Sequence, residues 1–128
     1  MSDHLVKRNK ESVSRFFNEV FNNGNMALVD ETIAPGYTYN GSPTTAEETK
    51  QWATGLRAAF GSLHFTIDEI LGEGEKVAIR WTMVGTDLKT SQKLTTSGTN
   101  IITNNAHGQA IANWQNGGTM QSLQPVKS

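Results

Sequence analysis

The stretch Val-Ala-Ile-Arg-Trp-Thr-Met-Val-Gly-Thr, residues 77–86, decides the fold of this chain. Large apolar side chains alternate along it with smaller or polar ones, and this period of two predicts a β-strand with one buried face. The face expected to be buried carries Val77, Ile79, Trp81 and Met83. Arg80 belongs to the opposite face, where we expect it to be paired or solvated.

Three other segments read as strands, at residues 63–67, 94–103 and 110–115. Turn-forming residues at 72–75 and 104–108 separate consecutive segments, so the strands are predicted to form an antiparallel meander. Residues 94–103 are rich in threonine and isoleucine, which strands favour. Within that segment Gly98 predicts a β-bulge that bends the sheet.

The first part of the chain has helical periodicity instead. Apolar residues of the segment 6–21 fall on one stripe of a helix. A short helix is expected at residues 26–33, and residues 37–44 read as a short strand followed by a turn. A third helix starts near Thr45, where either Thr44 with Glu47 or Thr45 with Glu48 forms a capping box. Its apolar stripe is Trp52, Leu56, Ala59 and Phe60.

Length and composition narrow the possibilities. With 128 residues the chain has the length of one domain, which we assign to residues 1–128 with a loose tail from about residue 124. A net charge of −1 offers no basic field for nucleic acid or acidic lipid. No cysteine is present, which excludes thiolate nucleophiles and cysteine-based zinc sites.

We expect a cytoplasmic protein that binds neither membrane nor nucleic acid. The charged N-terminal segment lacks the apolar core of a signal peptide, and no run of about 18 apolar residues predicts a membrane span. Helices at the start and meandering strands afterwards predict an α+β fold. The long N-terminal helix and two further helices should pack on a curved, mainly antiparallel sheet, forming a cone with an apolar interior and an open mouth.

This order of elements resembles the cone-shaped, cystatin-like roll of the nuclear transport factor 2-like superfamily. Finer matches resemble its SnoaL-like polyketide cyclase or ester cyclase branch, and together they cover about residues 10–123. They are Arg-Phe-Phe-Asn-Glu-Val-Phe-Asn-Asn-Gly at 15–24, Ile-Ala-Pro-Gly-Tyr at 33–37, Leu-Arg-Ala-Ala-Phe at 56–60, Leu-His-Phe-Thr-Ile at 63–67, and the strand at 77–86. These motifs describe packing, and none is catalytic by itself.

The departures from the family pattern fall where its chemistry should be. The branch often has histidine at the positions of Asn40 and Asp87. Its last strand usually carries Glu and His before the tryptophan and Asp after it, whereas this chain has Ala112, Asn113 and Gln115 around Trp114. Gln115 cannot titrate, so the resemblance implies a site whose usual acid is replaced by an amide.

The resembled cyclases use neither metal nor covalent nucleophile, and no cofactor is expected here. They remove a proton next to a carbonyl, which requires an acid/base group of shifted pKa and hydrogen-bond donors for the enolate. Asp87 is the best remaining acid if it shares the inward parity of the strand at 77–86. The alternative is that parity fails at Gly85 and Asp87 is a solvated turn residue. Gln115 could serve only as a donor.

Several neutral residues are candidates for ligand binding. Tyr37, Tyr39 and Asn40 enter the sheet near the rim of the cone, and Asn100 has inward parity. Asn113 and Gln115 either complete a neutral polar cavity floor with Asn100 or face the outside of the sheet; the sequence leaves both open. Trp52 and Trp81 are further candidates, although such tryptophans are more often core residues. His64 should face away from the core, and no metal-ligand spacing is present.

Three functions are compatible with this pattern. The first is a metal-free cyclase or isomerase-type lyase acting on a hydrophobic, oxygenated small molecule. The second is a protein that binds such a molecule without changing it, and the third is a dimerising scaffold whose cavity its own side chains fill. Fold alone does not choose among them. A homodimer is expected through the outer sheet face, with Thr95, Ser97, Thr99 and Thr103 on that surface.

Overall fold

A computed structural model describes residues 3–127 of the chain. The predicted domain of residues 1–128 therefore includes three residues, 1, 2 and 128, that lie outside the described part. The helices are α1 (Asp3–Phe16), the π-helix η1 (Phe17–Asn22), α2 (Ala27–Thr32), α3 (Ala46–Ala59) and the short 3₁₀ helix η2 (Met120–Ser122). The strands are β1 (Ile33–Tyr39), β2 (Ser42–Pro43), β3 (Phe60–Glu73), β4 (Lys76–Asp87), β5 (Lys93–Asn104), β6 (Ala110–Gly117) and β7 (Gln124–Pro125).

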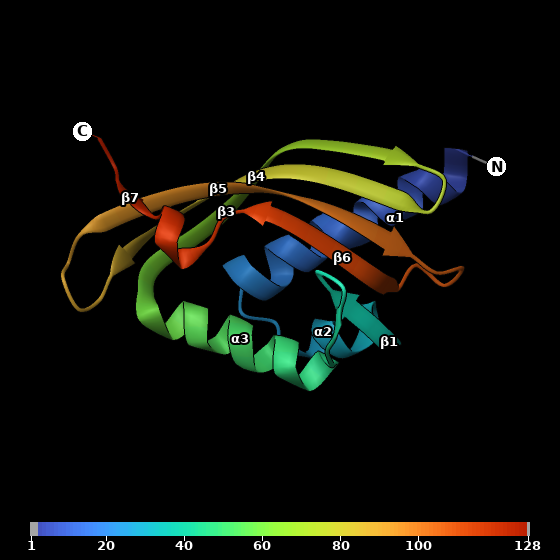
Figure 1. The fold of residues 1–128 in the computed structure, drawn as a ribbon, viewed down its shortest axis with the longest axis horizontal. Coiled ribbons are helices and arrows are strands. Elements are labelled where there is room, and N and C mark those ends of the chain that lie inside the picture. The colour runs from blue at the N-terminus through green and yellow to red at the C-terminus, as the bar shows by residue number, and fades with distance from the viewer. Residues whose placement is uncertain (1–2, 128) are drawn as a thin grey trace.

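The strands form one mixed sheet, which confirms the predicted α+β fold. Its order is β2-β1-β6-β5-β4-β3, with β7 paired to β5. The pairs β3–β4, β4–β5 and β5–β6 are antiparallel, as the meander predicts, whereas β1 joins β6 in parallel. The long strands curve over α1, and α3 lies across the open side of the curve (Figure 1).

The first helix changes its winding where it reaches the core. After Phe16 the α-helix gives way to the π-helix η1, which ends at Asn22, and Gly24 takes a positive φ of 74° just beyond it. A π-helix is a rare form that often occurs at functional sites. Here it directs Phe17 and Phe21 inward, where both are buried.

The start of α3 resolves the two capping alternatives in favour of Thr45 with Glu48. Thr45 has extended backbone angles, and its Oγ1 accepts a hydrogen bond from the Glu48 backbone N–H at 3.1 Å. Of the predicted stripe, Leu56 and Phe60 are buried, while Trp52 is 56% exposed. Trp52 therefore lies at the surface and is not part of the hydrophobic core.

Strand parity follows the sequence prediction closely. The inward residues Val77, Ile79, Trp81 and Met83 are all buried, and Arg80 is exposed on the outer face, where it pairs with Glu69 at 2.7 Å and Asp68 at 3.5 Å. The predicted outer-face positions of β5 are confirmed by their alternation with the buried Thr96, Gly98, Asn100, Ile102 and Asn104. His64 is exposed, as expected.

The prediction of a bulge at Gly98 is wrong. Gly98 pairs in unbroken register with Trp81 on β4, and the shifts of the β3–β4 pair lie elsewhere, between Gly61 and His64 and between Ile67 and Glu69. A Cβ at Gly98 would lie 2.7 Å from Trp81 Cζ2, and one at Gly118 would lie 2.2 Å from Cη2 of the same ring. The two glycines thus make the space that the Trp81 indole fills.

Residues 124–126 pair with β5, in contrast to the loose tail expected from about residue 124. Gly117 and Gly118 have positive φ values of 72° and 66° and turn the chain back after β6. The hydroxyls of Ser122 and Thr96 share a hydrogen bond, and β7 then pairs with Leu94 and Thr95 of β5. Within residues 3–127, no helix has the length and apolar character needed to cross a bilayer.

We expect Gly98→Ala to lower the free energy of unfolding by about 1–3 kcal/mol, because the added methyl overpacks the Trp81 site. Gly55→Ala is the matched control: Gly55 lies in α3, and no atom lies within 4 Å of the point where its methyl group would be added, so it should stabilise by about 0.5–1 kcal/mol. Urea unfolding of both variants measures the two values. Equal stability of Gly98→Ala and the wild type would contradict this account of Gly98.

Candidate functional site

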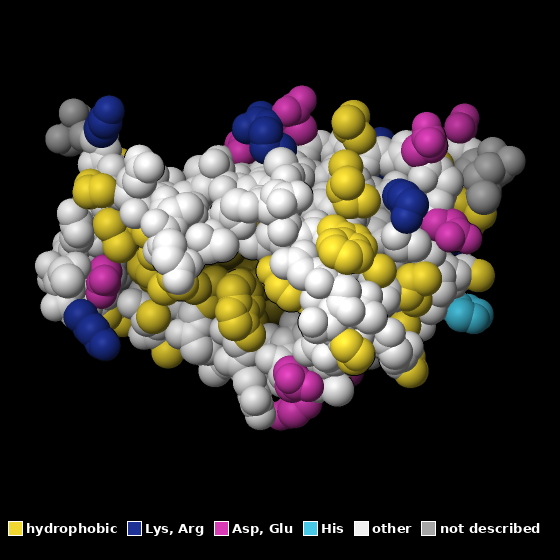
Figure 2. Space-filling view, viewed as in Figure 1, with side chains coloured by type: hydrophobic (Ala, Val, Ile, Leu, Met, Phe, Trp, Pro, Cys, Tyr) yellow, Lys and Arg dark blue, Asp and Glu magenta, His cyan; other side chains and the backbone are white. Residues whose placement is uncertain are grey.

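A cavity of about 520 Å³ opens between the concave face of the sheet, the α1–η1 helix, α3 and the segment after β6. Figure 2 shows it as a hollow with apolar side chains inside. The volume lies in the usual range for small-molecule sites. The cone is therefore not filled by its own side chains.

One side of the cavity is an aromatic wall made of Trp52, Phe21, Phe65 and Trp81. The ring centroids of successive members are 5.7, 4.7 and 5.1 Å apart, and the first contact is edge-to-face. The wall runs from the exposed Trp52 at the mouth to Trp81, which is 3% exposed. A continuous series of rings offers an extended apolar surface to a flat ligand.

The aromatic wall meets a polar cluster of Tyr37, Tyr39, Asn100, Asn113 and Gln115, all of which line the cavity. Trp81 Nε1–H donates to Asn100 Oδ1 at 2.6 Å. Asn100 Nδ2 donates to Asn113 Oδ1 at 2.8 Å and to Gln115 Oε1 at 3.3 Å. Asn113 and Gln115 therefore face the interior, which decides the alternative that the sequence left open.

The direction of these bonds follows from the indole. Because its N–H can only donate, it fixes which end of the Asn100 amide is the acceptor. The Asn100 nitrogen then donates onward, so the Asn113 nitrogen is turned toward Tyr37. Gln115 Oε1 accepts a second bond, from the Tyr39 hydroxyl at 2.9 Å, and Gln115 Nε2 donates to the Gly117 carbonyl at 3.1 Å.

The cluster keeps hydrogen-bond donors that have no partner within the described residues. Asn100 uses both amide hydrogens, whereas Asn113 and Gln115 each use one among the bonds within the described residues. The Tyr37 hydroxyl receives the Asn113 N–H, so its own hydrogen remains to be donated. Gln115 Oε1 already accepts two bonds. A hydrogen-bond acceptor, such as a carbonyl oxygen, can use these donors.

Desolvation raises the pKa values of both tyrosines of the cluster. Desolvation raises the pKa of Tyr37 to about 12, although the hydrogen bond from Asn113 opposes the shift. The pKa of Tyr39 is also raised by burial. Both phenols are therefore hydrogen-bonding groups and not bases at neutral pH.

Asp87 lies outside this cavity, which corrects the expectation that it is the inward acid. The cavity's lining includes Met83 of β4 but not Asp87, at the strand's end. Its Oδ1 accepts the Lys89 backbone N–H at 2.8 Å, and its backbone pairs with Ser91 and Gln92 across the turn. Asp87 is therefore a turn residue, which was the alternative to an inward acid. Its carboxylate caps the β4–β5 connection.

Asn40 is likewise not among the lining residues. Its Oδ1 accepts the Gln115 backbone N–H at 2.7 Å, and its own N–H donates to the Asn113 carbonyl at 2.8 Å. With a φ of 50° it forms the turn between β1 and β2. Asn40 thus ties β1 to β6 and holds Asn113 and Gln115 in place without facing a ligand. The other predicted residues, Tyr37, Tyr39, Trp52, Trp81, Asn100, Asn113 and Gln115, all line the cavity.

Sequence reasoning missed a carboxylate at the cavity. Glu48 lines it from the first turn of α3 and is, among the described residues, the one charged side chain of the lining. Its spacing of four from Trp52 was the available signal, since residues four apart share a helix face. The segment after β6 was missed as well, and it contributes Gly118, Thr119, Met120 and Leu123.

The described residues contain no group of three or more His, Cys, Asp or Glu side chains placed to hold a metal ion. Comparison with known proteins then places the chain in a family. The model of the SnoaL-like polyketide cyclases matches residues 11–119. This chain belongs to the SnoaL-like polyketide cyclase family. No curated protein matches its sequence.

Solved structures of candidate polyketide cyclases share the fold over nearly the whole chain. A candidate polyketide cyclase from Acidithiobacillus ferrooxidans is 25% identical, with a TM-score of 0.78 and coverage of 95% of this chain and 94% of that one. A candidate polyketide cyclase from Bacillus cereus is 20% identical, with a TM-score of 0.81 and coverage of 95% and 82%. IdmH, a candidate polyketide cyclase from Streptomyces antibioticus, is 19% identical, with a TM-score of 0.76 and coverage of 89% and 94%.

We expect alkaline titration of the phenolate absorbance to show no tyrosine with the ordinary pKa of 10 in the folded protein. A pKa raised on folding contributes stability that is fully present below pH 10. That contribution is lost as the pH rises from 10 toward about 12. Tyr37→Phe should reduce this alkaline loss, measured as the pH dependence of the free energy of unfolding. A phenol that ionises at pH 10 in the folded wild type, which has only two tyrosines, would argue against the burial of the cluster.

Proposed function

We propose that this protein binds a flat, largely apolar small molecule bearing a carbonyl oxygen and acts on it as a cyclase or isomerase-type enzyme. The observation that carries the proposal is the set of unused hydrogen-bond donors in the polar cluster beside the aromatic wall. The rings provide contact area for the apolar body of the ligand. The spare donors of Tyr37, Asn113 and Gln115 can then hold its carbonyl oxygen.

The same geometry suits an enolate. When a proton leaves the carbon next to a bound carbonyl, negative charge develops on the oxygen, and donors already aimed at that oxygen stabilise it. The Tyr37 hydroxyl is suited to this role because it lines the cavity and carries a hydrogen that is not used within the described residues. We take Gln115 to occupy the position of the acid that the family pattern places after the tryptophan, so that it holds the oxygen and does not move the proton.

Binding without turnover is the second candidate, and one observation favours it. Asn100, Asn113 and Gln115 cannot exchange protons near neutral pH, and the pKa values of the two tyrosines are raised. Turnover would therefore need a base from outside the polar cluster.

Incubating a bound ketone in heavy water separates the candidates: a cyclase or isomerase exchanges the hydrogens next to the carbonyl, whereas a carrier leaves them in place. Native mass spectrometry of freshly purified protein would show whether a small molecule is retained.

We expect Tyr37→Phe to weaken binding of a naphthyl methyl ketone by about three- to tenfold, the loss of one hydrogen bond of about 0.5–1.5 kcal/mol. Binding of the matching alkylnaphthalene, which has no acceptor, should stay the same. Quenching of tryptophan fluorescence measures both affinities, and Trp114→Phe on the outer face is the control variant. An equal loss for both probes would mean that Tyr37 shapes the cavity and does not hold an oxygen.

We also propose that two copies of the chain pair through the outer face of the sheet. An apolar row crosses this face, because Leu71 pairs with Ala78, Ala78 with Ile101, and Ile101 with Trp114. Leu71, Ile101 and Trp114 are 68%, 49% and 53% exposed. The predicted threonine and serine positions of β5 flank the row, and their short side chains allow close approach of a second sheet.

Ile101→Lys should shift the assembly from dimer to monomer, because it places a charge in the centre of the apolar row. Lys93→Glu, at the end of β5 and away from the row, is the control for a change of charge. Sedimentation velocity measures the mass of each variant. A wild-type protein that sediments as a monomer at all concentrations would contradict the proposed pairing.

A further inference from the structure

We infer that the cavity selects a ligand with a protonated amine at the end that lies at the mouth, and that Glu48 is the specificity-determining residue. This inference rests on the proposed function, because it concerns the same cavity and the same ligand. The polar cluster holds one end of the molecule through an acceptor oxygen. The charge at the mouth then decides what the other end carries.

The first observation is the charge of the lining. Glu48 is its one charged residue among the described residues, and no Lys, Arg or His belongs to it. A carboxylate or phosphate on the ligand would enter without a counter-ion and would meet a like charge. A cationic group would meet an opposite charge.

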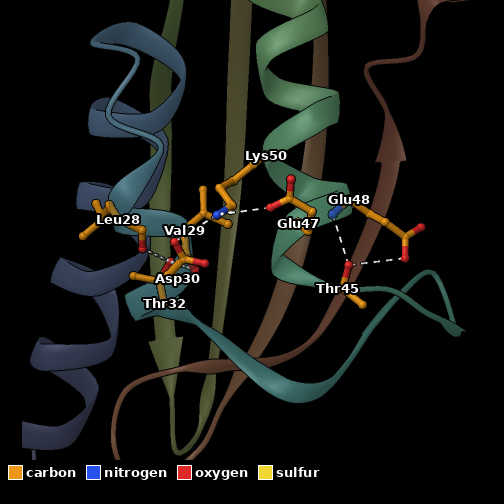
Figure 3. Close-up of polar contacts among 8 residues, drawn as sticks. All are labelled: Leu28, Val29, Asp30, Thr32, Thr45, Glu47, Glu48 and Lys50. Atoms are coloured by element: carbon orange, nitrogen blue, oxygen red, sulfur yellow. Dashed lines mark hydrogen bonds and ion pairs between the residues drawn. The ribbon is translucent and has the colours of Figure 1, made fainter.

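The second observation is the contrast between two adjacent glutamates. Glu47 forms an ion pair with Lys50 at 3.3 Å, and Lys50 also pairs with Asp30 at 3.0 Å. Figure 3 shows the side chain of Glu47 directed toward Lys50 and that of Glu48 directed away from it. Within the described residues Glu48 has no ion pair; its carboxylate accepts only a hydrogen bond from the Thr45 hydroxyl, at 3.3 Å.

The third observation is the neighbour of Glu48 on the cavity face of α3. Trp52 lies one turn further along the helix and is 56% exposed, and both residues line the cavity. The face of an indole attracts a cation, and a carboxylate beside it adds direct charge attraction. Glu48 and Trp52 together make a mouth that suits an ammonium group, whereas an alcohol gains little there and a carboxylate is repelled.

Capping of α3 does not require the carboxylate of Glu48. The bond that caps the helix runs from the Glu48 backbone N–H to Thr45 Oγ1 and does not need the side chain. Glu48→Gln therefore keeps the cap and an acceptor oxygen while it removes the charge. Glu47→Gln removes the same charge one residue earlier, outside the cavity, and is the matched control.

The test uses three naphthyl methyl ketones that carry, at the far end of the ring system, an aminomethyl, a hydroxymethyl or a carboxylate group. For the wild type we expect the affinity order amine, alcohol, carboxylate, with the amine at least about tenfold tighter than the carboxylate. Glu48→Gln should bring this ratio close to one, and Glu47→Gln should leave it near the wild-type value. Added salt should reduce the ratio in the wild type, since the mouth is open to solvent.

The possible outcomes distinguish the role of Glu48 from the proposed function. If Glu48→Gln keeps the wild-type ratio, or if Glu47→Gln lowers it equally, Glu48 is not the selecting group and the inference is wrong, while ketone binding and the proposed function stand. If none of the three ketones binds to the wild type, the proposed function fails and the inference fails with it. Thermal unfolding of both variants verifies that they are folded before affinities are compared.

Discussion

The hydrogen bond from Trp81 Nε1–H to Asn100 Oδ1 sets the arrangement of the whole site. An indole nitrogen has one hydrogen and no acceptor, so it removes the freedom of the Asn100 amide to be reversed. Asn100 is 2% exposed, and an unpaired amide at that depth costs about 1–3 kcal/mol. The order of donors and acceptors through Asn113 and Gln115 is therefore a consequence of one buried pair.

That pair depends in turn on two glycines. The Trp81 ring fits between Gly98 on the neighbouring strand and Gly118 after β6, and a methyl group at either position would overlap it. The positive φ of Gly118 also turns the chain toward η2, whose Met120 lines one side of the cavity. The fit of the Trp81 ring therefore constrains three features together: the sheet register, the packing of the indole and the course of the C-terminal segment.

The sequence predicted most of the fold because periodicity reports which face of an element is buried. The inward parity of Val77 to Met83 and of Asn100 is of this kind, and so is the outward position of Arg80. Pattern alone could not orient Asn113 and Gln115, because amides are found on either face of a strand. Their orientation depends on a hydrogen-bond partner, Asn100, that lies on another strand.

The remaining errors have a common cause. Asp87, Asn40 and Gly98 were interpreted from their own strand, but each is determined by a contact with another segment: a turn, the β1–β6 junction and the Trp81 ring. The same holds for the segment after β6, whose position follows from its pairing with β5. Glu48 was missed because a polar residue in the first turn of a helix is expected to be a capping group.

The interior and the mouth of this cavity differ in how they accommodate charge. Near Asn100 a charge would be costly, because burial removes its solvation, and the chain places only neutral amides and phenols of raised pKa there. At the mouth water still solvates the Glu48 carboxylate, and a charge can be kept without a partner. Neutral donors inside can hold an oxygen as its charge changes, whereas a fixed charge at the entrance acts on the ligand before it is desolvated. The cavity thus keeps neutral hydrogen-bonding groups in its interior and, among the described residues, its one charged side chain at the mouth.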